Sequence, residues 1–314
     1  MKLKKPKFWD INKPNFFSNL LLPFAKIVEF KSKFSFKTKK KFKNIKTICV
    51  GNIYIGGTGK TSLSIEIKKM LDKENIKSCF IKKDYSDQID EQKLLKKFGK
   101  TFLNKSRILA LQEAISEKYA IAIFDDGLQD KDIEYDLIFV CFNKKNMIGN
   151  ERVIPAGPLR ESFTNIKRYK NIFLNGNNEN SDYHKDLLRK QSQDLDIFES
   201  EYEISNLKSL NIKEKYIVFS GIGNHSTFIE TLIKNKIHII QNIEYPDHYK
   251  YTKSDLEKII KSSYEKNASI LTTEKDFLRI DNEYQKKINY VKIFLKIVEM
   301  NKFKNKLLDF YENN

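Results

Sequence analysis

The sequence predicts an α/β protein with a parallel-sheet lobe, a second, smaller α/β lobe and an N-terminal amphipathic helix. Three observations lead to this fold class. From residue 46 onward, short apolar runs alternate with helical stretches, which is typical of a parallel sheet covered by helices on both faces. A second series of the same kind follows, and the first 45 residues are basic around an apolar helical stripe. With 314 residues, the chain is long enough for two cores.

Residues 1–45 predict an amphipathic helix between basic flanks. In "FFSNLLLPFAKIVEF" the apolar side chains share one helical face, and Pro23 should break or kink the helix. The apolar face consists of Phe17, Leu20, Leu21, Phe24, Ile27 and Val28, and the opposite face carries Ser18, Asn19, Lys26 and Glu29. The flanking lysines are Lys2, Lys4, Lys5, Lys7 and Lys13, then Lys31, Lys33, Lys37, Lys39, Lys40, Lys41 and Lys43. This pattern indicates a segment in an anionic membrane interface; the alternative is a helix packed on the protein's own core.

Composition narrows the class of protein. The formal net charge of +17 favours an anionic partner, which could be nucleic acid, an acidic membrane or a phosphorylated substrate, although a general lysine bias would give the same number. No stretch approaches the roughly 20 apolar residues of a spanning helix. Cys49, Cys79 and Cys141 lie in β-like runs without metal-site spacing, so we expect buried core thiols in a reducing cytoplasm.

The main chain divides into two predicted lobes, 46–205 and 206–314. The first series comprises strands in "KTICV", "SCFI", "AIAIF", "YDLIFVCF" and "NIFL", with helices near 61–73 and 106–118. The polar loop 175–181 is expected to connect the lobes. The second series comprises "YIVFSGIG", "KIHIIQNIEY", "ASILTTEKD" and "NYVKIFLKI", with helices near 226–234, 253–266 and 301–311.

A glycine-rich turn between a predicted strand and a predicted helix indicates a phosphate-binding loop. It reads Gly56, Gly57, Thr58, Gly59, Lys60 and Thr61. Glycines let backbone N–H groups approach phosphates, while Lys60 can meet the β/γ oxygens and the Thr61 hydroxyl can ligate Mg²⁺. The strict P-loop pattern has glycine where this chain has Tyr54. The strand and helix around the turn still favour nucleotide binding over an ordinary glycine-rich turn.

Two adjacent carboxylates, Asp125 and Asp126, end the apolar strand "AIAIF". Because the carboxyl ends of parallel strands meet at one edge of the sheet, we expect them beside the phosphate loop and a bound Mg²⁺. The alternative is a turn or helix-capping pair.

Three further clusters are weaker indications. "RVIPAGPLRE" places Arg160 in a rigid loop, where it could meet a phosphate or simply be structural. "YPDHY" sets Asp247 beside His248, which is more often a surface feature than a catalytic pair. "TTEKD" follows a strand, and its simplest interpretation is a turn capped by Thr273.

Taken together and in order, "VGNIYIGGTGKTSL", "DDGLQ", "IPAGPLRE", "YPDHYKYT" and "LTTEKD" resemble the tetraacyldisaccharide 4′-kinase (lipid A 4′-kinase) family. The resemblance covers nearly the whole chain, and "NLLLPFAKIVEF" looks like the family's N-terminal membrane helix. It implies two lobes joined by a β-ribbon hinge at the cytoplasmic face of the bacterial inner membrane. It also implies transfer of the ATP γ-phosphate to the 4′-hydroxyl of a tetraacylated disaccharide 1-phosphate, giving the bis-phosphorylated lipid A precursor.

The resemblance also implies roles for individual residues. Lys60 and Thr61 would bind ATP and Mg²⁺, with Asp125 and Asp126 at the metal. Gln129, Arg160 and Glu161 would line the substrate site. The family's favoured base carries over to Asp90 in "IDEQKLL", with His248 as its supporting imidazole. A carboxylate that accepts the acceptor hydroxyl's proton late in the reaction suits phosphoryl transfer.

The chain departs from the family pattern at two places. Asp130 stands where "DDGLQH" would have histidine, and "KKDYSD" replaces an "SRGYGR"-like segment, keeping Tyr85 but losing both glycines. The loop at 82–90 is therefore expected to be built differently. Two alternatives remain: a nucleic-acid-dependent NTPase, which should carry a basic groove with interleaved aromatic residues, and a non-catalytic membrane-bound nucleotide switch. Because the lysines cluster around the apolar helix, we expect a lipid substrate and an anionic membrane rather than nucleic acid, and the sequence identifies no protein partner.

Overall fold

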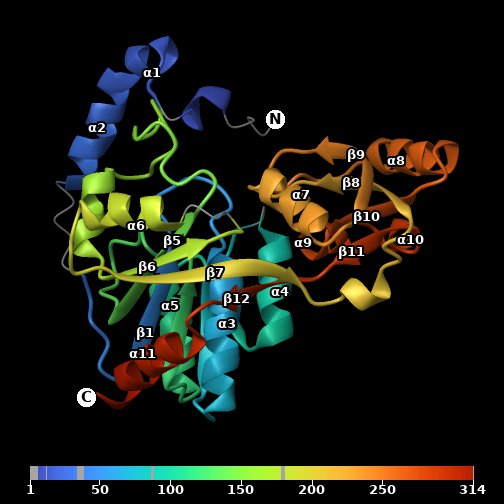
Figure 1. Cartoon of the computed structure of the whole chain (residues 1–314). Helices are drawn as coiled ribbons and strands as arrows, with labels where there is room; N and C mark the ends of the chain where they lie inside the picture. Colours follow the sequence, from blue (N-terminus) through green and yellow to red (C-terminus); the bar gives the residue numbers. More distant parts are fainter. Residues whose placement is uncertain (1–5, 12, 34–38, 86–87, 178–180, 314) are drawn as a thin grey trace. The chain divides into compact units, whose positions relative to one another are not determined.

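The computed structural model describes residues 6–11, 13–33, 39–85, 88–177 and 181–313. The chain forms two compact units (Figure 1). The larger unit comprises Lys5–Tyr85, Leu95–Glu201 and Ile297–Asn314, and the smaller unit is built mainly from Ser86–Leu94 and Tyr202–Lys296. The chain thus passes between the units within helix α4 (Ile89–Phe98) and strands β7 (Asp196–Ile204) and β12 (Ile293–Ile297).

The larger unit is organised by an eight-stranded sheet with the order β12-β7-β6-β5-β1-β4-β2-β3. Neighbouring strands from β7 to β3 pair in parallel. The remaining strands of this sheet are β1 (Lys46–Gly51), β2 (Ser78–Lys83), β3 (Thr101–Asn104), β4 (Ile121–Asp125), β5 (Leu137–Asn143) and β6 (Asn171–Asn175). Central strands β1 and β4 are almost entirely buried, as expected for a parallel sheet covered on both faces.

Helices cover both faces of this sheet. One apolar core packs α5 (Arg107–Ser116) and α6 (Ser181–Arg189) against alternate strand residues such as Cys49 and Val140. On the opposite face, Phe303 of α11 (Met300–Glu312) contacts the rings of Phe139, Phe173 and Phe198. Helix α3 (Lys60–Lys73) packs against β1, β2 and β4. The larger unit also contains the 3-10 helix η2 (Phe163–Arg168). The three cysteines are free and buried, which confirms the prediction of core thiols.

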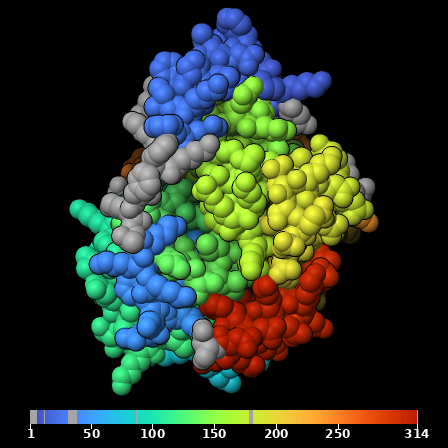
Figure 2. Space-filling view, turned by 90° about the vertical axis from the view of Figure 1, so that its left-hand side faces the viewer, coloured from blue at the N-terminus to red at the C-terminus, as the bar shows by residue number. Residues whose placement is uncertain are grey.

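The N-terminal segment forms a 3-10 turn, Lys7–Trp9, and two short helices, α1 (Phe16–Leu20) and α2 (Leu22–Lys33). The predicted break is confirmed, with Pro23 in the first turn of α2, where proline is tolerated. A group of exposed apolar side chains gathers on these two helices: Phe16, Phe17, Leu20, Phe24, Ile27 and Phe30, with exposures of 53–75%. Figure 2 shows this segment (blue) at one end of the larger unit, against green residues from the middle of the chain.

One residue of this segment faces opposite to the prediction. Ser18 is fully buried, because its hydroxyl donates a 2.8 Å hydrogen bond to the Ala156 carbonyl and accepts one from Asn150. Several of the flanking lysines, Lys2, Lys4, Lys5 and Lys37, lie outside the described residues. In the described part of the chain, no helix is both long and apolar enough to cross a membrane.

The smaller unit contains a four-stranded, all-parallel sheet with the order β11-β10-β8-β9. Its strands are β8 (Lys215–Ser220), β9 (His238–Glu244), β10 (Ser269–Thr273) and β11 (Asn289–Val291). Helix α8 (Lys253–Glu265) packs on one face with Ile217 and Phe219, and α7 (His225–Lys234) on the other with Tyr216 and Val218. Shorter helices are η3 (Leu207–Ser209), α9 (Glu274–Phe277) and α10 (Asn282–Gln285).

The observed division differs from the predicted one at three points. Strand β7 carries the chain across the boundary at Glu201, four residues before the predicted limit, and the closing helix α11 belongs to the larger unit. The loop expected to connect the lobes instead joins β6 to α6 inside the larger unit, where residues 178–180 lie outside the described range. Individual elements also differ from the prediction. The run "NYVKIFLKI", expected as one strand, forms two strands, β11 and β12. Four elements, α4, β3, α6 and β7, were not predicted.

Candidate active site

The glycine-rich turn lies between β1 and α3, as predicted from the sequence. Gly59 precedes α3 with φ +86° and Gly56 has φ +132°, conformations that strain any residue with a Cβ. The turn is held from outside by two buried amides. Asn52 Nδ2 donates to the Tyr54 carbonyl at 2.6 Å and to Thr58 Oγ1 at 2.9 Å, and Asn175 Nδ2 donates to the Thr58 carbonyl at 2.6 Å. The Asn52 and Asn175 amides therefore fix the shape of the turn from within the protein.

Asp125 lies beside the start of α3 because β4 pairs in register with β1, Asp125 opposite Val50. Its Oδ2 accepts hydrogen bonds from Thr61 Oγ1 at 3.1 Å and from Lys82 Nζ at 2.7 Å, while Ser64 Oγ lies 3.3 Å from Oδ1. The side chains of Lys82 and Asp125 are 2% and 0% exposed, so this ion pair is fully buried. The structure thus joins the predicted residues Thr61 and Asp125, and adds a lysine that the sequence analysis did not single out.

Asp126 takes part in a second polar cluster. Its Oδ1 lies 3.7 Å from Lys60 Nζ and accepts a 2.9 Å hydrogen bond from Arg160 Nη1. The same Arg160 nitrogen donates to Gln129 Oε1 at 2.8 Å, and Gln129 Nε2 donates to the Asn52 carbonyl at 2.8 Å. Lys60, Asp126, Gln129 and Arg160, predicted from three separate motifs, are therefore close together in the larger unit.

Backbone pairing explains why Arg160 reaches this cluster. The segment that begins the glycine-rich turn pairs with the "PAGPLR" loop: Ile55 N donates to the Pro158 carbonyl at 2.8 Å, and Arg160 N donates to the Ile53 carbonyl at 2.7 Å. Glu161 behaves differently, since its carboxylate accepts hydrogen bonds from Asn165 Nδ2 at 3.1 Å and from the Tyr169 hydroxyl at 3.2 Å. These hydrogen bonds hold the Glu161 carboxylate on residues that follow it in the chain, and Glu161 itself follows Arg160.

Electrostatics keep Asp126 ionised. Burial alone would raise the pKa of this carboxyl, but the charges of Lys60 and Arg160 outweigh it and lower the pKa to about 2. Asp126 also has φ +59°, an uncommon backbone conformation for a residue with a side chain. Such conformations gather at functional sites, where surrounding contacts hold them.

Arg107 and Asp130 form a pair that the sequence analysis missed. Arg107 Nη1 lies 3.2 Å from Asp130 Oδ2, and Arg107 Nη2 donates a 2.6 Å hydrogen bond to the Asp126 carbonyl. Asp130, the residue that departs from the family pattern, is thus paired with a cation that also supports the backbone of Asp126. The sequence signal was weak, because Arg107 and Asp130 lie in different segments and meet only in the folded sheet.

The smaller unit brings together Asp90 and His248, which are separated by 158 positions. Asp90 is in the first turn of α4 and is 2% exposed. Its Oδ1 lies 3.0 Å from His248 Nδ1, and its Oδ2 accepts a 2.9 Å hydrogen bond from Arg279 Nη2. His248, in the loop after β9, has φ +55°. The chain from 82 to 85 and from 88 onward is described, whereas residues 86 and 87 of the altered loop lie outside the described residues.

The charges around this pair favour an ionised Asp90. Burial would raise the pKa of Asp90, but the hydrogen bond from His248 and the charges of Arg279 and Lys275 lower it to about 2. For His248, burial would lower the pKa, and the hydrogen bond and charge of Asp90 with the charge of Asp247 raise it above the ordinary value. Each residue therefore favours the charged form of the other.

The residues at the glycine-rich turn fit a magnesium ion bound together with phosphates. They supply two carboxylates, Asp125 and Asp126, and the Thr61 hydroxyl, all hard oxygen donors. Mg²⁺ is commonly held by one or two carboxylates plus substrate phosphates, rather than by a dedicated cage. The described residues contain no cluster of three or more His, Cys, Asp or Glu side chains arranged to hold a metal on their own.

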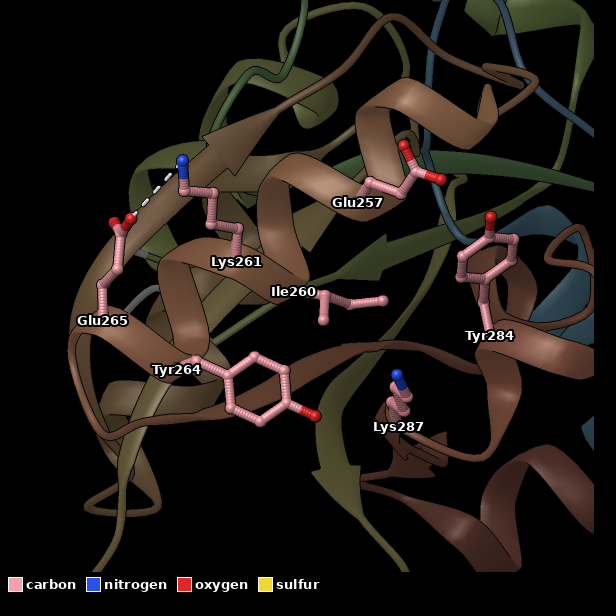
Figure 3. Close-up of a pocket in the computed structure, with 7 residues that line it drawn as sticks. All are labelled: Glu257, Ile260, Lys261, Tyr264, Glu265, Tyr284 and Lys287. Atoms are coloured by element: carbon pink, nitrogen blue, oxygen red, sulfur yellow. Dashed lines mark ion pairs between the residues drawn. The ribbon is translucent and has the colours of Figure 1, made fainter.

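The smaller unit also has a surface pocket, which is lined by other residues than those described above. Figure 3 shows its lining side chains, with Lys261 paired to Glu265 on α8 and the Tyr264 and Tyr284 rings at the pocket wall. It has a volume of about 540 Å³ and is lined also by Glu257, Ile260 and Lys287. None of the residues predicted for the site lines this pocket.

A parallel sheet with a glycine-rich turn, a lysine, a hydroxyl and two strand-end carboxylates defines a P-loop protein of the phosphotransferase type. The chain also matches the sequence profile of the tetraacyldisaccharide-1-P 4′-kinase family over residues 16–97 and 89–312. It belongs to this family.

Individual relatives agree with this assignment. The chain is 54% identical to the tetraacyldisaccharide 4′-kinase of Pelagibacter ubique, over 100% of both chains. It is 31% identical to the enzyme of the same name from Rickettsia typhi, over 90% of this chain and 91% of that one. The crystal structure of LpxK from Aquifex aeolicus in complex with ATP has a TM-score of 0.67 and 21% identity, and covers 94% of this chain and 99% of that chain. This likeness confirms the predicted fold class.

Proposed function

We propose that this chain transfers the γ-phosphate of ATP to the 4′-hydroxyl of a tetraacyldisaccharide 1-phosphate, producing the bis-phosphorylated lipid A precursor. The observation that carries the proposal is the cluster of Lys60, Thr61, Asp125 and Asp126 at the glycine-rich turn, in a chain 54% identical to a tetraacyldisaccharide 4′-kinase. The fold alone would allow other phosphotransferases, whereas the five ordered motifs and the family match specify this acceptor.

In this reaction the larger unit would bind the nucleotide. Backbone N–H groups of residues 56–61 and the N-terminus of α3 would surround the phosphates, and Lys60 would leave Asp126 to contact the β and γ oxygens. Arg160 lies on the same carboxylate as Lys60, so its guanidinium is suited to a second phosphate contact. Gln129 would hold Arg160 in place through the hydrogen bond between them.

Magnesium would be held by Thr61, Asp125 and Asp126 together with phosphate oxygens. When bound, Mg²⁺ supplies positive charge to the oxygens on which negative charge develops. The residues of this chain then have separate tasks: Thr61 and Asp125 fix the start of α3 against β4, and Arg160 holds the Asp126 carboxylate.

Asp90 would accept the proton of the attacking hydroxyl, with His248 orienting it. A carboxylate with a pKa of about 2 is a weak base, but it is ionised at neutral pH and needs no prior deprotonation. In the loose transition state of phosphoryl transfer, the hydroxyl proton leaves late, when the oxygen has become acidic, so a weak base is sufficient.

The exposed apolar side chains of α1 and α2 would lie in the cytoplasmic leaflet of the inner membrane. Phe16, Phe17 and Phe24 are 75%, 60% and 59% exposed, and such a group of large apolar side chains is unusual on a water-facing surface. Neighbouring lysines would contact anionic headgroups. The acyl chains of the substrate would lie in the same leaflet, so this position would bring the enzyme to its acceptor.

The reaction is tested by transfer of labelled γ-phosphate from Mg-ATP to tetraacyldisaccharide 1-phosphate in detergent micelles. We expect transfer by the native chain, loss of at least about 100-fold in Lys60→Ala through lost phosphate contacts, and native rates in Lys190→Ala, which alters an exposed lysine of the same unit. ATP binding without transfer would instead identify the nucleotide switch. Hydrolysis stimulated by polynucleotide and not by the lipid would identify a nucleic-acid-dependent NTPase.

The membrane proposal is tested by co-sedimentation with vesicles of phosphatidylethanolamine and phosphatidylglycerol. Replacing Phe16, Phe17 and Phe24 by serine should release the protein into the supernatant, because the buried apolar area is lost. Ile233→Ser is the matched control, since Ile233 is 61% exposed but lies in the smaller unit. Equal sedimentation of the triple variant and the control would contradict the proposal.

A further inference from the structure

Arg279 occupies a buried position beside the proposed base. It follows α9 and β10, and its side chain is only 10% exposed. Its guanidinium makes three close contacts within the smaller unit. Nη2 donates to Asp90 Oδ2 at 2.9 Å, and Nη1 donates to the Gly221 carbonyl at 2.8 Å and lies 3.2 Å from Asp276 Oδ1.

The two oxygens of Asp90 are held from different elements. His248 Nδ1 lies 3.0 Å from Oδ1, and Arg279 Nη2 lies 2.9 Å from Oδ2. With both oxygens bonded, the carboxylate cannot rotate without breaking one of these contacts. Each oxygen keeps a further lone pair, so the carboxylate retains an acceptor position whose direction is fixed. His248 alone would leave the second oxygen unrestrained.

Arg279 also supports the loop that carries His248. The Gly221 carbonyl accepts hydrogen bonds from both Arg279 Nη1 and the backbone N–H of His248, the latter at 2.9 Å. Asp276 completes this arrangement, since its Oδ1 accepts from the Gly221 N–H at 2.9 Å and from the Tyr251 hydroxyl at 2.7 Å. The carboxyl ends of β8, β9 and β10 are thereby linked around one guanidinium.

We propose that Arg279 is a positioning residue for phosphoryl transfer, orienting the Asp90 carboxylate toward the acceptor hydroxyl and fixing the loop that carries His248. The inference rests on the proposed kinase function and on Asp90 as its base. Arginine suits the task because its planar guanidinium is always charged and donates in several fixed directions at once. A lysine would keep the charge but could not bond Asp90 and Gly221 in the same geometry.

The test is a double-mutant cycle in the micelle assay, measured on the full chain. Arg279→Gln should lower kcat by on the order of 100-fold, the loss expected when a catalytic group is misplaced by about 1 Å, and leave KM for ATP unchanged. Arg279→Lys should recover only part of that loss. In the Asp90→Asn background, Arg279→Gln should change kcat by less than about 3-fold, because groups that act as a unit lose their effect together.

Controls separate this inference from the proposals beneath it. Arg189→Gln alters an exposed arginine and should keep native rates. Circular dichroism of each variant checks folding, and if Arg279→Gln does not fold, the cycle is run with Arg279→Lys. Equal losses from the Arg279 substitution in the native and Asp90→Asn backgrounds would overturn the inference. Full activity of Asp90→Asn would overturn the base assignment, and absence of transfer by the native chain would overturn the kinase proposal.

Discussion

The buried pair between Lys82 and Asp125 gives a sharp prediction for Lys82→Met. Methionine fills similar space without a charge, so the substitution leaves the Asp125 carboxylate, 0% exposed, without its ammonium partner at 2.7 Å. The carboxylate keeps hydrogen bonds from Thr61 and Ser64. These hydroxyls reduce the cost without replacing the lost positive charge.

The size of the effect follows from the burial of both partners. Removing one member of a buried ion pair usually costs about 3–5 kcal/mol, because an uncompensated charge remains in a medium of low polarity. Since Asp125 keeps two hydroxyl donors, we expect about 3 kcal/mol for Lys82→Met. The matched control is Lys68→Met, a buried lysine whose partner Asp72 is 48% exposed and hydrated, and there we expect less than about 1 kcal/mol.

Urea unfolding of the two variants measures both costs, and the double variant Lys82→Met/Asp125→Asn isolates the charge. If an unpaired carboxylate causes the loss, the double variant should be more stable than Lys82→Met alone. Added Mg²⁺ should stabilise Lys82→Met more than the native chain, because the ion supplies positive charge to Asp125. A loss no larger than that of Lys68→Met, or a double variant less stable than the single one, would refute the reasoning.

Three further predictions concern pH, a helix cap and the core. Because folding lowers the pKa of Asp90 to about 2, the ionised carboxylate stabilises the folded chain at pH values above its ordinary pKa, and this stabilisation is lost as the pH falls toward 2. The free energy of unfolding of the native chain should therefore fall by about 2 kcal/mol relative to that of Asp90→Asn between about pH 4 and pH 2. Parallel pH curves for the two proteins would contradict this. Thr273 is the N-cap of α9, and its hydroxyl accepts a 3.1 Å hydrogen bond from Asp276 N. Thr273→Ala should therefore lower the free energy of unfolding in urea by about 1–2 kcal/mol, and an unchanged value would mean that the cap is dispensable. Phe303→Ala opens the cluster with Phe139, Phe173 and Phe198 and should cost about 3–5 kcal/mol, against less than about 0.5 kcal/mol for the exposed Tyr311→Ala.

The sequence was most informative where the signal is local. The turn at 56–61, its strand and its helix could be predicted because glycine conformation and apolar periodicity depend on neighbouring residues alone. The break at Pro23 and the cap at Thr273 belong to the same class. The polar loop after β6 was misassigned because a connection between two elements looks the same whether it joins lobes or lies within one.

Contacts between distant segments were beyond local reasoning. Ser18 was predicted to face outward because helical periodicity cannot register the Ala156 carbonyl that binds its hydroxyl. Lys82 was noticed only as part of an altered motif, although it lies in the last two residues of β2, a strand two places from β1 in the sheet, and reaches Asp125. The same applies to Arg107, which pairs with Asp130.

By itself, the sequence determined the class of fold, the glycine-rich turn between a strand and a helix, the strand-end carboxylates and the family of the chain. The tertiary structure alone decided that Lys82 neutralises Asp125, that Arg160 and Lys60 share Asp126, and that Arg279 and His248 hold Asp90. The physical reason is that parallel strands bring their carboxyl ends to one edge in an order set by crossovers, not by position along the chain. Which charges become partners there depends on strand order and register, and no local pattern in the sequence encodes either.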